Sequence, residues 1–125
     1  MMLGFYQHSQ DRLVVNASRQ QIEHSLTDAE QIQTWIRPQA LDPNFPMVLT
    51  PGVIYKSAWG VITIAHEVTE LNDRCLKLVL SEGIDGFHYW HWDDGWLESR
   101  LEGVSLLPLT LLHHYVLFRL RSFLC

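Results

Sequence analysis

The sequence predicts an α+β domain in which a curved antiparallel sheet wraps around a long C-terminal helix. From residue 53 to 101, apolar and polar residues alternate between turn signals, a pattern typical of half-buried antiparallel strands. From residue 109 to 124, apolar residues recur at helical spacing over so wide a surface that we expect it to be buried along most of its length. The apolar face of the sheet is the only predicted surface large enough to cover that helix.

Size and composition are those of one folded domain. The 125 residues, 47% of them hydrophobic and 18% charged, suit a single core, so we expect one domain over 1–125. Nine basic against fourteen acidic residues argue against a nucleic-acid partner, because phosphate binding needs a basic surface. Cys75 and Cys125 form no Cys-x-x-Cys pair, so we expect neither a disulfide scaffold nor a zinc site.

No segment predicts export or membrane insertion. The N-terminus lacks the charged head and continuous apolar run of a signal peptide. The most apolar stretch, 106–124, is interrupted by Pro, His and Arg, which makes it a poor spanning helix and a better buried one. We therefore expect a cytoplasmic protein with no stable membrane insertion.

The first elements are a strand and two short helices. Residues 12–18 predict a strand that ends at Ser18, which caps a helix carrying Ile22 and Leu26 on one face. Thr27 or Asp28 then begins a second helix, whose predicted apolar side holds Ile32, Trp35 and Ile36. Four prolines between 37 and 51 predict a loop with an irregular or edge strand.

Four hairpins follow if the turns lie at Trp59-Gly60, 71–73, 83–85 and Asp94-Gly95. All four registers agree on which face is apolar, and a slip of one residue would turn that face to solvent. The predicted inward pairs are Ser57–Ile62, Tyr55–Ile64, Val53–His66, Val68–Leu76, His66–Leu78, Ile64–Leu80, Leu80–His88, Leu78–Trp90, Leu76–Trp92, Trp92–Leu97, Trp90–Ser99 and His88–Leu101.

Pro108 suits the first turn of the last helix. Of the adjacent His113 and His114, at most one can face the sheet, because neighbouring helical positions differ by about 100°. The apolar stripe predicted to face the sheet consists of Leu109, Leu112, Val116, Leu120 and Phe123, flanked by Leu111, Tyr115 and Phe118.

This order of elements resembles the START-like, or SRPBCC, helix-grip superfamily. NASRQQIEHSLTDAEQIQTWI is similar to the family's opening, TPGVIYKSAWGVITIAHEVTELNDRCLKL to its Pro-Gly entry and strand end, and GWLESRLEGVSLLPLTLLHHYVLFRLRSFL to its last strand and grip helix. The family includes polyketide cyclases and aromatases, activators of a heat-shock ATPase, plant-allergen-type carriers and lipid-transfer domains. The resemblance implies a cavity for an apolar ligand between helix and sheet, and the short 37–51 segment implies a small or partly filled one.

The aromatic stretch 86–100 holds His88 and His91, which cannot share a metal ion because strand residues three apart point to opposite faces. We expect no metal and no cofactor. The inward residues suit either a packed core or a pocket wall, since buried histidine and tyrosine need polar partners, and the resemblance favours the pocket. The predicted ligand-binding residues are Tyr55, Ile64, His66, Leu78, His88, Trp90, Trp92, Ser99, Leu112 and Tyr115.

Three functions fit these residues, and we expect binding rather than catalysis. The first is a carrier or sensor of a small hydrophobic molecule, lipid-like or polyketide-like. The second is a cofactor-free cyclase or dehydratase in which His66 or His88 is the general base and Tyr55 orients the substrate. The third is a protein-interaction module like the ATPase activators, with Trp59 and Trp96 exposed at neighbouring turns.

Overall fold

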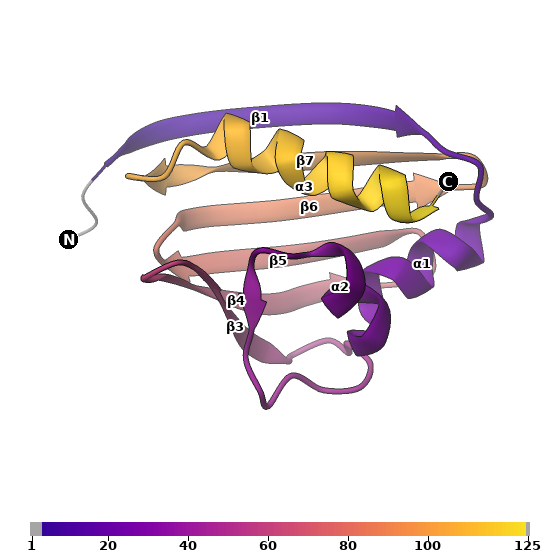
Figure 1. Ribbon diagram of the computed structural model, residues 1–125, viewed down its shortest axis with the longest axis horizontal. Helices are drawn as coiled ribbons and strands as arrows, with labels where there is room; N and C mark the ends of the chain where they lie inside the picture. The colour runs from indigo at the N-terminus through magenta and orange to yellow at the C-terminus, as the bar shows by residue number, and fades with distance from the viewer. Residues whose placement is uncertain (1–3, 125) are drawn as a thin grey trace.

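The computed structural model describes residues 4–124 and contains one seven-stranded antiparallel sheet. The sheet curves around the C-terminal helix, and two short helices follow the first strand (Figure 1), so the predicted helix-grip α+β fold is confirmed. Spatially the strands run in the order β1-β7-β6-β5-β4-β3-β2. The elements are β1 (Phe5–Val14), α1 (Arg19–Thr27), α2 (Ala29–Trp35), β2 (Ala40–Leu41), β3 (Ile54–Trp59), β4 (Ile62–Leu71), β5 (Cys75–Glu82), β6 (Asp85–Asp93), β7 (Trp96–Ser105) and α3 (Leu109–Leu124).

The helix starts were predicted better than the first strand. Ser18 caps α1 in a capping box with Gln21, and the α1 residues Ile22 and Leu26 are buried as expected. The predicted strand 12–18 is wrong in its bounds, because β1 begins at Phe5 and ends at Val14. The early part of β1 is polar and hides its strand character, yet all ten of its residues pair with β7.

The β6–β7 hairpin confirms the predicted turn at Asp94-Gly95 and all three predicted pairs across it. The other three predicted registers are wrong by two residues. The first turn lies at Gly60-Val61 rather than at Trp59-Gly60, because Gly60 supplies the positive φ of 62° that this turn needs. Trp59 therefore stays in the strand and pairs with Ile62.

The β4–β5 and β5–β6 hairpins also differ from their predicted registers by two residues. Between β4 and β5 an irregularity at Val68–Glu70 shifts the register, so Leu71 pairs with Leu76 instead of lying in the turn. A shift of two keeps every side chain on its face, so the predicted apolar face survives although the pairs change. The observed pairs are Tyr55–His66, Ser57–Ile64, Val68–Leu78, His66–Leu80, Ile64–Glu82, Leu80–Gly86, Leu78–His88 and Leu76–Trp90, while Val53 bonds to the backbone of Val68.

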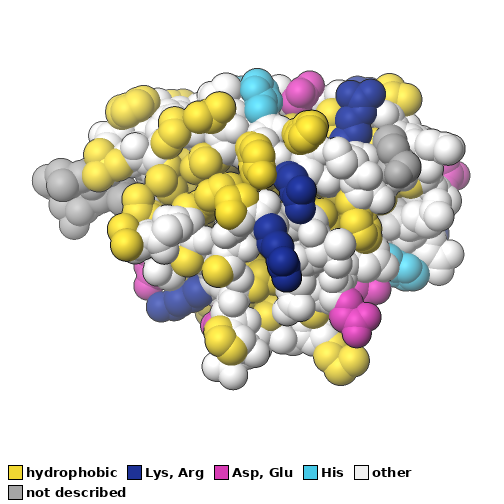
Figure 2. Space-filling view, in the orientation of Figure 1, with side chains coloured by type: hydrophobic (Ala, Val, Ile, Leu, Met, Phe, Trp, Pro, Cys, Tyr) yellow, Lys and Arg dark blue, Asp and Glu magenta, His cyan; other side chains and the backbone are white. Residues whose placement is uncertain are grey.

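The helix α3 confirms only part of the predicted inward stripe, because Leu109 and Leu120 are buried as expected and Phe123 is exposed. Its buried residues are Leu109, His113, Leu117 and Leu120. Of the predicted stripe, Leu112 and Val116 are only half-buried, and Phe123 and the flanking Leu111, Tyr115 and Phe118 are exposed. The helix is rotated because His113 finds hydrogen-bond partners on the sheet, whereas His114 faces solvent. Figure 2 shows apolar side chains along the line of α3 on the outer surface.

Trp59 and Trp96 do not form the surface patch that would have favoured an interaction module. Trp59 lies beside the β3–β4 turn and Trp96 beside the β6–β7 turn, and in this meander those turns lie at opposite ends of the sheet. Trp96 packs under the Arg12 guanidinium instead, 4.4 Å from it. Within residues 4–124, no helix is both long enough and apolar enough to cross a membrane.

Candidate functional site

A cavity of about 80 Å³ lies between the inner face of the sheet and the three helices. Its lining is apolar apart from a few histidine, serine, glutamine and tyrosine groups. Among the predicted ligand-binding residues, those that line it are Tyr55, Ile64, His66, Leu78, His88, Trp90 and Leu112. That they bind a ligand stays a prediction.

The other three predicted residues lie elsewhere. Trp92 is fully buried, and its indole Nε1 has no hydrogen-bond partner within the described chain. Ser99 lies behind the cavity wall, where it bonds to His88 and His113. Tyr115 is 42% exposed and meets the ring of Trp59 edge-on at the rim.

Several lining residues escaped the sequence reasoning. Trp35 and Ile32 were placed on the apolar side of α2, and that signal was sufficient to include them. His113 has a weaker signal, because a histidine on an apolar helix face does not say which way it points. No sequence signal places Gln39 at the cavity, because it lies in an irregular segment that only the tertiary fold brings there.

One set of polar side chains crosses the core and ends at the cavity; we call Ser9, His113, Ser99 and His88 the His88 chain. His113 Nδ1 lies 2.7 Å from Ser9 Oγ, and His113 Nε2 lies 2.8 Å from Ser99 Oγ. Ser99 Oγ is also 2.9 Å from His88 Nε2. The chain thus joins β1, α3, β7 and β6 through side chains alone.

A second set, the His66 chain, consists of Gln39, Ser57 and His66. Gln39 Nε2 donates to Ser57 Oγ, and Ser57 Oγ lies 2.8 Å from His66 Nε2. The His66 ring stacks on Tyr55 with centroids 4.6 Å apart and the planes 5° from parallel. Its Nδ1 atom is enclosed and has no hydrogen-bond partner in residues 4–124.

The histidines of both chains are electrically neutral at pH 7. Burial lowers the pKa of His66 to about 4. Burial lowers the pKa of His113 to about 4, and the neighbouring His114 is the second-largest cause of that decrease. The pKa of His88 is also well below its ordinary value, first through burial and then through His113 and His66. These rings are therefore hydrogen-bonding groups rather than cations.

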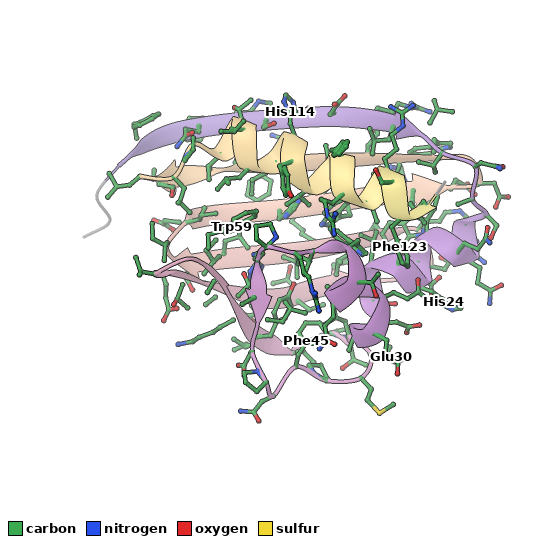
Figure 3. The ribbon with its side chains drawn as sticks, viewed as in Figure 1. His24, Glu30, Phe45, Trp59, His114 and Phe123 are labelled. Atoms are coloured by element: carbon green, nitrogen blue, oxygen red, sulfur yellow. The ribbon has the colours of Figure 1, made fainter. Side chains whose placement is uncertain are left out.

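The cavity has a side on which its wall is only half-buried. The wall residues there are Ile36, Trp59, Leu112 and Val116, and Figure 3 shows Trp59 between α3 and β2. An outer groove lined by Arg37, Tyr115 and Arg119 adjoins it, since Gln39 belongs to both. Among the described residues we find no group of three or more His, Cys, Asp or Glu that could hold a metal ion.

Solved structures share this fold at low sequence identity. A protein of Chromobacterium violaceum, CV1439, has a TM-score of 0.77 and 13% identity over 94% of this chain and 97% of its own. An Aha1 dimer from Colwellia psychrerythraea has a TM-score of 0.69 and 12% identity over 94% and 96%. DynU16, from the dynemicin biosynthetic locus, has a TM-score of 0.70 and 16% identity over 94% of this chain and 46% of its own.

Identities this low establish a shared fold and nothing about activity. No model of a known protein family matches the sequence, and no curated protein matches it either. The function must therefore be argued from the cavity itself.

Proposed function

We propose that the protein binds a small, mainly apolar molecule in the cavity beneath α3, as a carrier or sensor. The observation that carries this proposal is an internal apolar space with a few polar groups at fixed positions, which is the usual composition of small-molecule sites. A simple core of this size would be filled by Leu or Phe. Here side chains leave the space unfilled, and His88, one of the polar residues that line it, is half-buried.

The size of the cavity limits the ligand. Drug-sized ligands occupy pockets of roughly 300–1,000 Å³, and this cavity measures about 80 Å³. A dry apolar cavity of roughly 150 Å³ can hold benzene. Because this cavity has only about half that volume, we infer a ligand no larger than about one ring, which would enter with a small outward movement of the half-buried wall. A longer lipid or polyketide would need a larger movement of the same wall.

Binding can be tested with toluene, methylenecyclohexane and dodecane as probes. Tryptophan fluorescence should change, because Trp90 lines the cavity, and the melting temperature should rise with the two single-ring probes by mass action. The substitution Leu78→Phe fills the cavity and should abolish both effects. Val79→Phe introduces the same side chain on the outer face of β5, where Val79 is 42% exposed, and should leave both intact.

The proposal fails if none of the three probes changes either signal in the unsubstituted protein. It also fails if Leu78→Phe and Val79→Phe respond alike, because binding would then lie outside the cavity.

A second candidate is cofactor-free acid–base catalysis, favoured by the His88 chain, whose last member lines the cavity. DynU16, from a biosynthetic locus, has the same fold. Against it, a general base works best with a pKa near the working pH, and burial holds the pKa of His88 well below that. Deuterium exchange at the α-carbon of cyclohexanone in D₂O tests it: exchange no faster than in buffer rejects catalysis.

We also propose a cellular location. The cysteine pattern, with two cysteines and no Cys-x-x-Cys pair, favours the reducing cytoplasm. Fractionation of cells that express the full chain would test this prediction.

A further inference from the structure

The direction of the hydrogen bonds in the His88 chain follows from counting donors. A neutral imidazole has one N–H and one bare nitrogen, and a serine hydroxyl has one hydrogen to donate. If Ser9 donates to His113 Nδ1, then His113 Nε2–H donates to Ser99, and Ser99 donates to His88 Nε2. Each of these hydrogens then has an acceptor.

The opposite direction leaves a buried hydrogen without an acceptor. His88 Nε2–H would donate to Ser99, and the last hydroxyl, that of Ser9, would have no acceptor among the described residues. Ser9 is 5% exposed, so water does not replace that bond freely. A buried donor without a partner costs about 1–3 kcal/mol. The first direction leaves only His88 Nδ1–H unpaired within residues 4–124, and that atom is not enclosed, so the first direction prevails.

With Nε2 accepting, the proton of His88 resides on Nδ1. That atom makes no hydrogen bond within residues 4–124, and it is not one of the enclosed unpartnered atoms, which are His66 Nδ1 and Trp92 Nε1. It therefore keeps accessible surface. Because the His88 side chain lines the cavity, that surface is where a ligand atom can approach.

We propose that the cavity selects ligands with a neutral carbonyl oxygen, which accepts a hydrogen bond from His88 Nδ1–H. This inference rests on the proposed function and adds the ligand's chemical class. The same reasoning applies to the His66 chain: Gln39 donates to Ser57, which leaves the Ser57 hydrogen to be donated to His66 Nε2, 2.8 Å away. However, His66 Nδ1 is enclosed, so His88 is the accessible donor.

A carboxylate fits the same position poorly. The cavity lining contains no Lys, Arg, Asp or Glu among the described residues, and an ionised group buried without a cationic partner is strongly disfavoured. The arginines Arg37 and Arg119 line the outer groove rather than the cavity. A ketone, an aldehyde or a lactone of about one ring satisfies both the donor and the apolar wall.

The tautomer of His88 can be measured directly on ¹⁵N-labelled protein without ligand. Long-range ¹H–¹⁵N correlation at pH 7.5 distinguishes a protonated Nδ1 from a protonated Nε2, and His88→Gln assigns the signal. We expect Nδ1–H at His88 and Nε2–H at His113. Nε2–H at His88 would overturn the inference even if the cavity binds ligands.

Cyclohexanone and methylenecyclohexane form a matched pair that differs in the carbonyl oxygen. We expect His88→Phe to weaken cyclohexanone binding between about twofold and tenfold more than methylenecyclohexane binding, the range of one neutral hydrogen bond. His91→Phe makes the same exchange on the outer face of β6 and should leave the ratio unchanged.

The outcomes separate this inference from the function it rests on. Binding of neither probe to the unsubstituted protein would reject the cavity as a site and this inference with it. Binding of both probes, with His88→Phe weakening them equally, would keep the site and reject the carbonyl contact. If His88→Phe does not fold, the tautomer measurement still decides.

Discussion

The two serine–histidine chains beneath the cavity use the same groups but differ in how completely they are bonded. The His88 chain spans β1, β7, β6 and α3, and both ring nitrogens of its central His113 have partners. The His66 chain spans the irregular segment at Gln39, then β3 and β4, and leaves His66 Nδ1 enclosed without a partner. The His88 chain thus satisfies both nitrogens of its central histidine, whereas the His66 chain leaves one nitrogen of its histidine unpaired within residues 4–124.

The difference follows from what covers each half. The long helix α3 places a side chain with two hydrogen-bonding nitrogens directly over β7 and β1. The β3–β4 half is covered by the short α2 and by the irregular segment that leads to β2. That cover supplies one amide, from Gln39. Tyr55, on β3 itself, stacks on His66 but forms no bond with its Nδ1.

The largest expected effect comes from removing the central hydroxyl of each chain. Ser99→Ala leaves His88 Nε2 and His113 Nε2 without their partner, and we expect it to lower the free energy of unfolding by about 2–5 kcal/mol. Ser57→Ala should cost about 1–2 kcal/mol, because Gln39 can turn towards the outer groove. Urea unfolding measures both. Equal losses would show that the chains are equivalent in stability.

Acid should destabilise the fold, and more through the His88 chain, which holds two of the three histidines. With a pKa of about 4 in the fold for His66 and His113, against the ordinary 6.5, the unfolded chain binds protons first as the pH falls below 6.5. Each such histidine then lowers the free energy of unfolding by about 1.4 kcal/mol per pH unit down to pH 4. Above pH 6.5 the effect is absent.

This pH dependence is checked by unfolding at pH 7.5, 6 and 5. His113→Gln and His66→Gln should each reduce the slope by one histidine's share, and their double substitution by two shares. His24→Gln, at an exposed histidine of α1 that belongs to neither chain, is the control. Asp11 raises and His8 lowers the pKa of His113, so Asp11→Asn and His8→Gln test these two contributions. Slopes unchanged by His113→Gln would mean that the ring titrates normally in the fold.

A smaller effect is expected from replacing each ring with an apolar one. His66→Phe removes the unpartnered nitrogen and keeps the stack on Tyr55, so the free energy of unfolding should change by less than about 1 kcal/mol. His113→Phe removes two bonded nitrogens and should cost about 2 kcal/mol. Thermal melts compare the two variants, and a greater loss at His66 would reverse the comparison.

The smallest effect concerns the link between the halves. Arg119 on α3 donates to the carbonyl oxygens of Trp35 and Thr34 at the end of α2, over 3.2 and 3.4 Å. Arg119→Met should lower the free energy of unfolding by about 0.5–1 kcal/mol and speed amide exchange in residues 36–41. Amide exchange that stays unchanged would show that α2 is held by its packing alone.

Much of the fold could be predicted because face and periodicity are local properties. The alternation at Tyr55, Ser57 and Ile64 fixes which side chains point inward, whichever turn is chosen. The register depends on a single turn residue, and Gly60 takes its positive φ at a position that alternation does not reveal. The early part of β1 went unrecognised because its only buried residue is Ser9.

The cavity residues show the same limit. Leu78 and Trp90 followed from strand parity, and both line the cavity. Tyr115 was placed on the inner side because an apolar helix face normally packs on a sheet. The polar partners Ser9 and Ser99 hold His113 on the inner side of the helix instead. Long-range polar complementarity of this kind leaves no local periodic signal.

The pairing of β1 with β7 also sets the order in which the chain can assemble. Phe5 lies opposite Ser105, so the first strand has no partner until nearly all of the chain has emerged from the ribosome. Contacts this distant in sequence close late and slow folding. The His88 chain depends on the same closure, since Ser9, Ser99 and His113 come from opposite ends of the chain. The carbonyl-binding donor would therefore acquire its fixed tautomer only in the last step of folding.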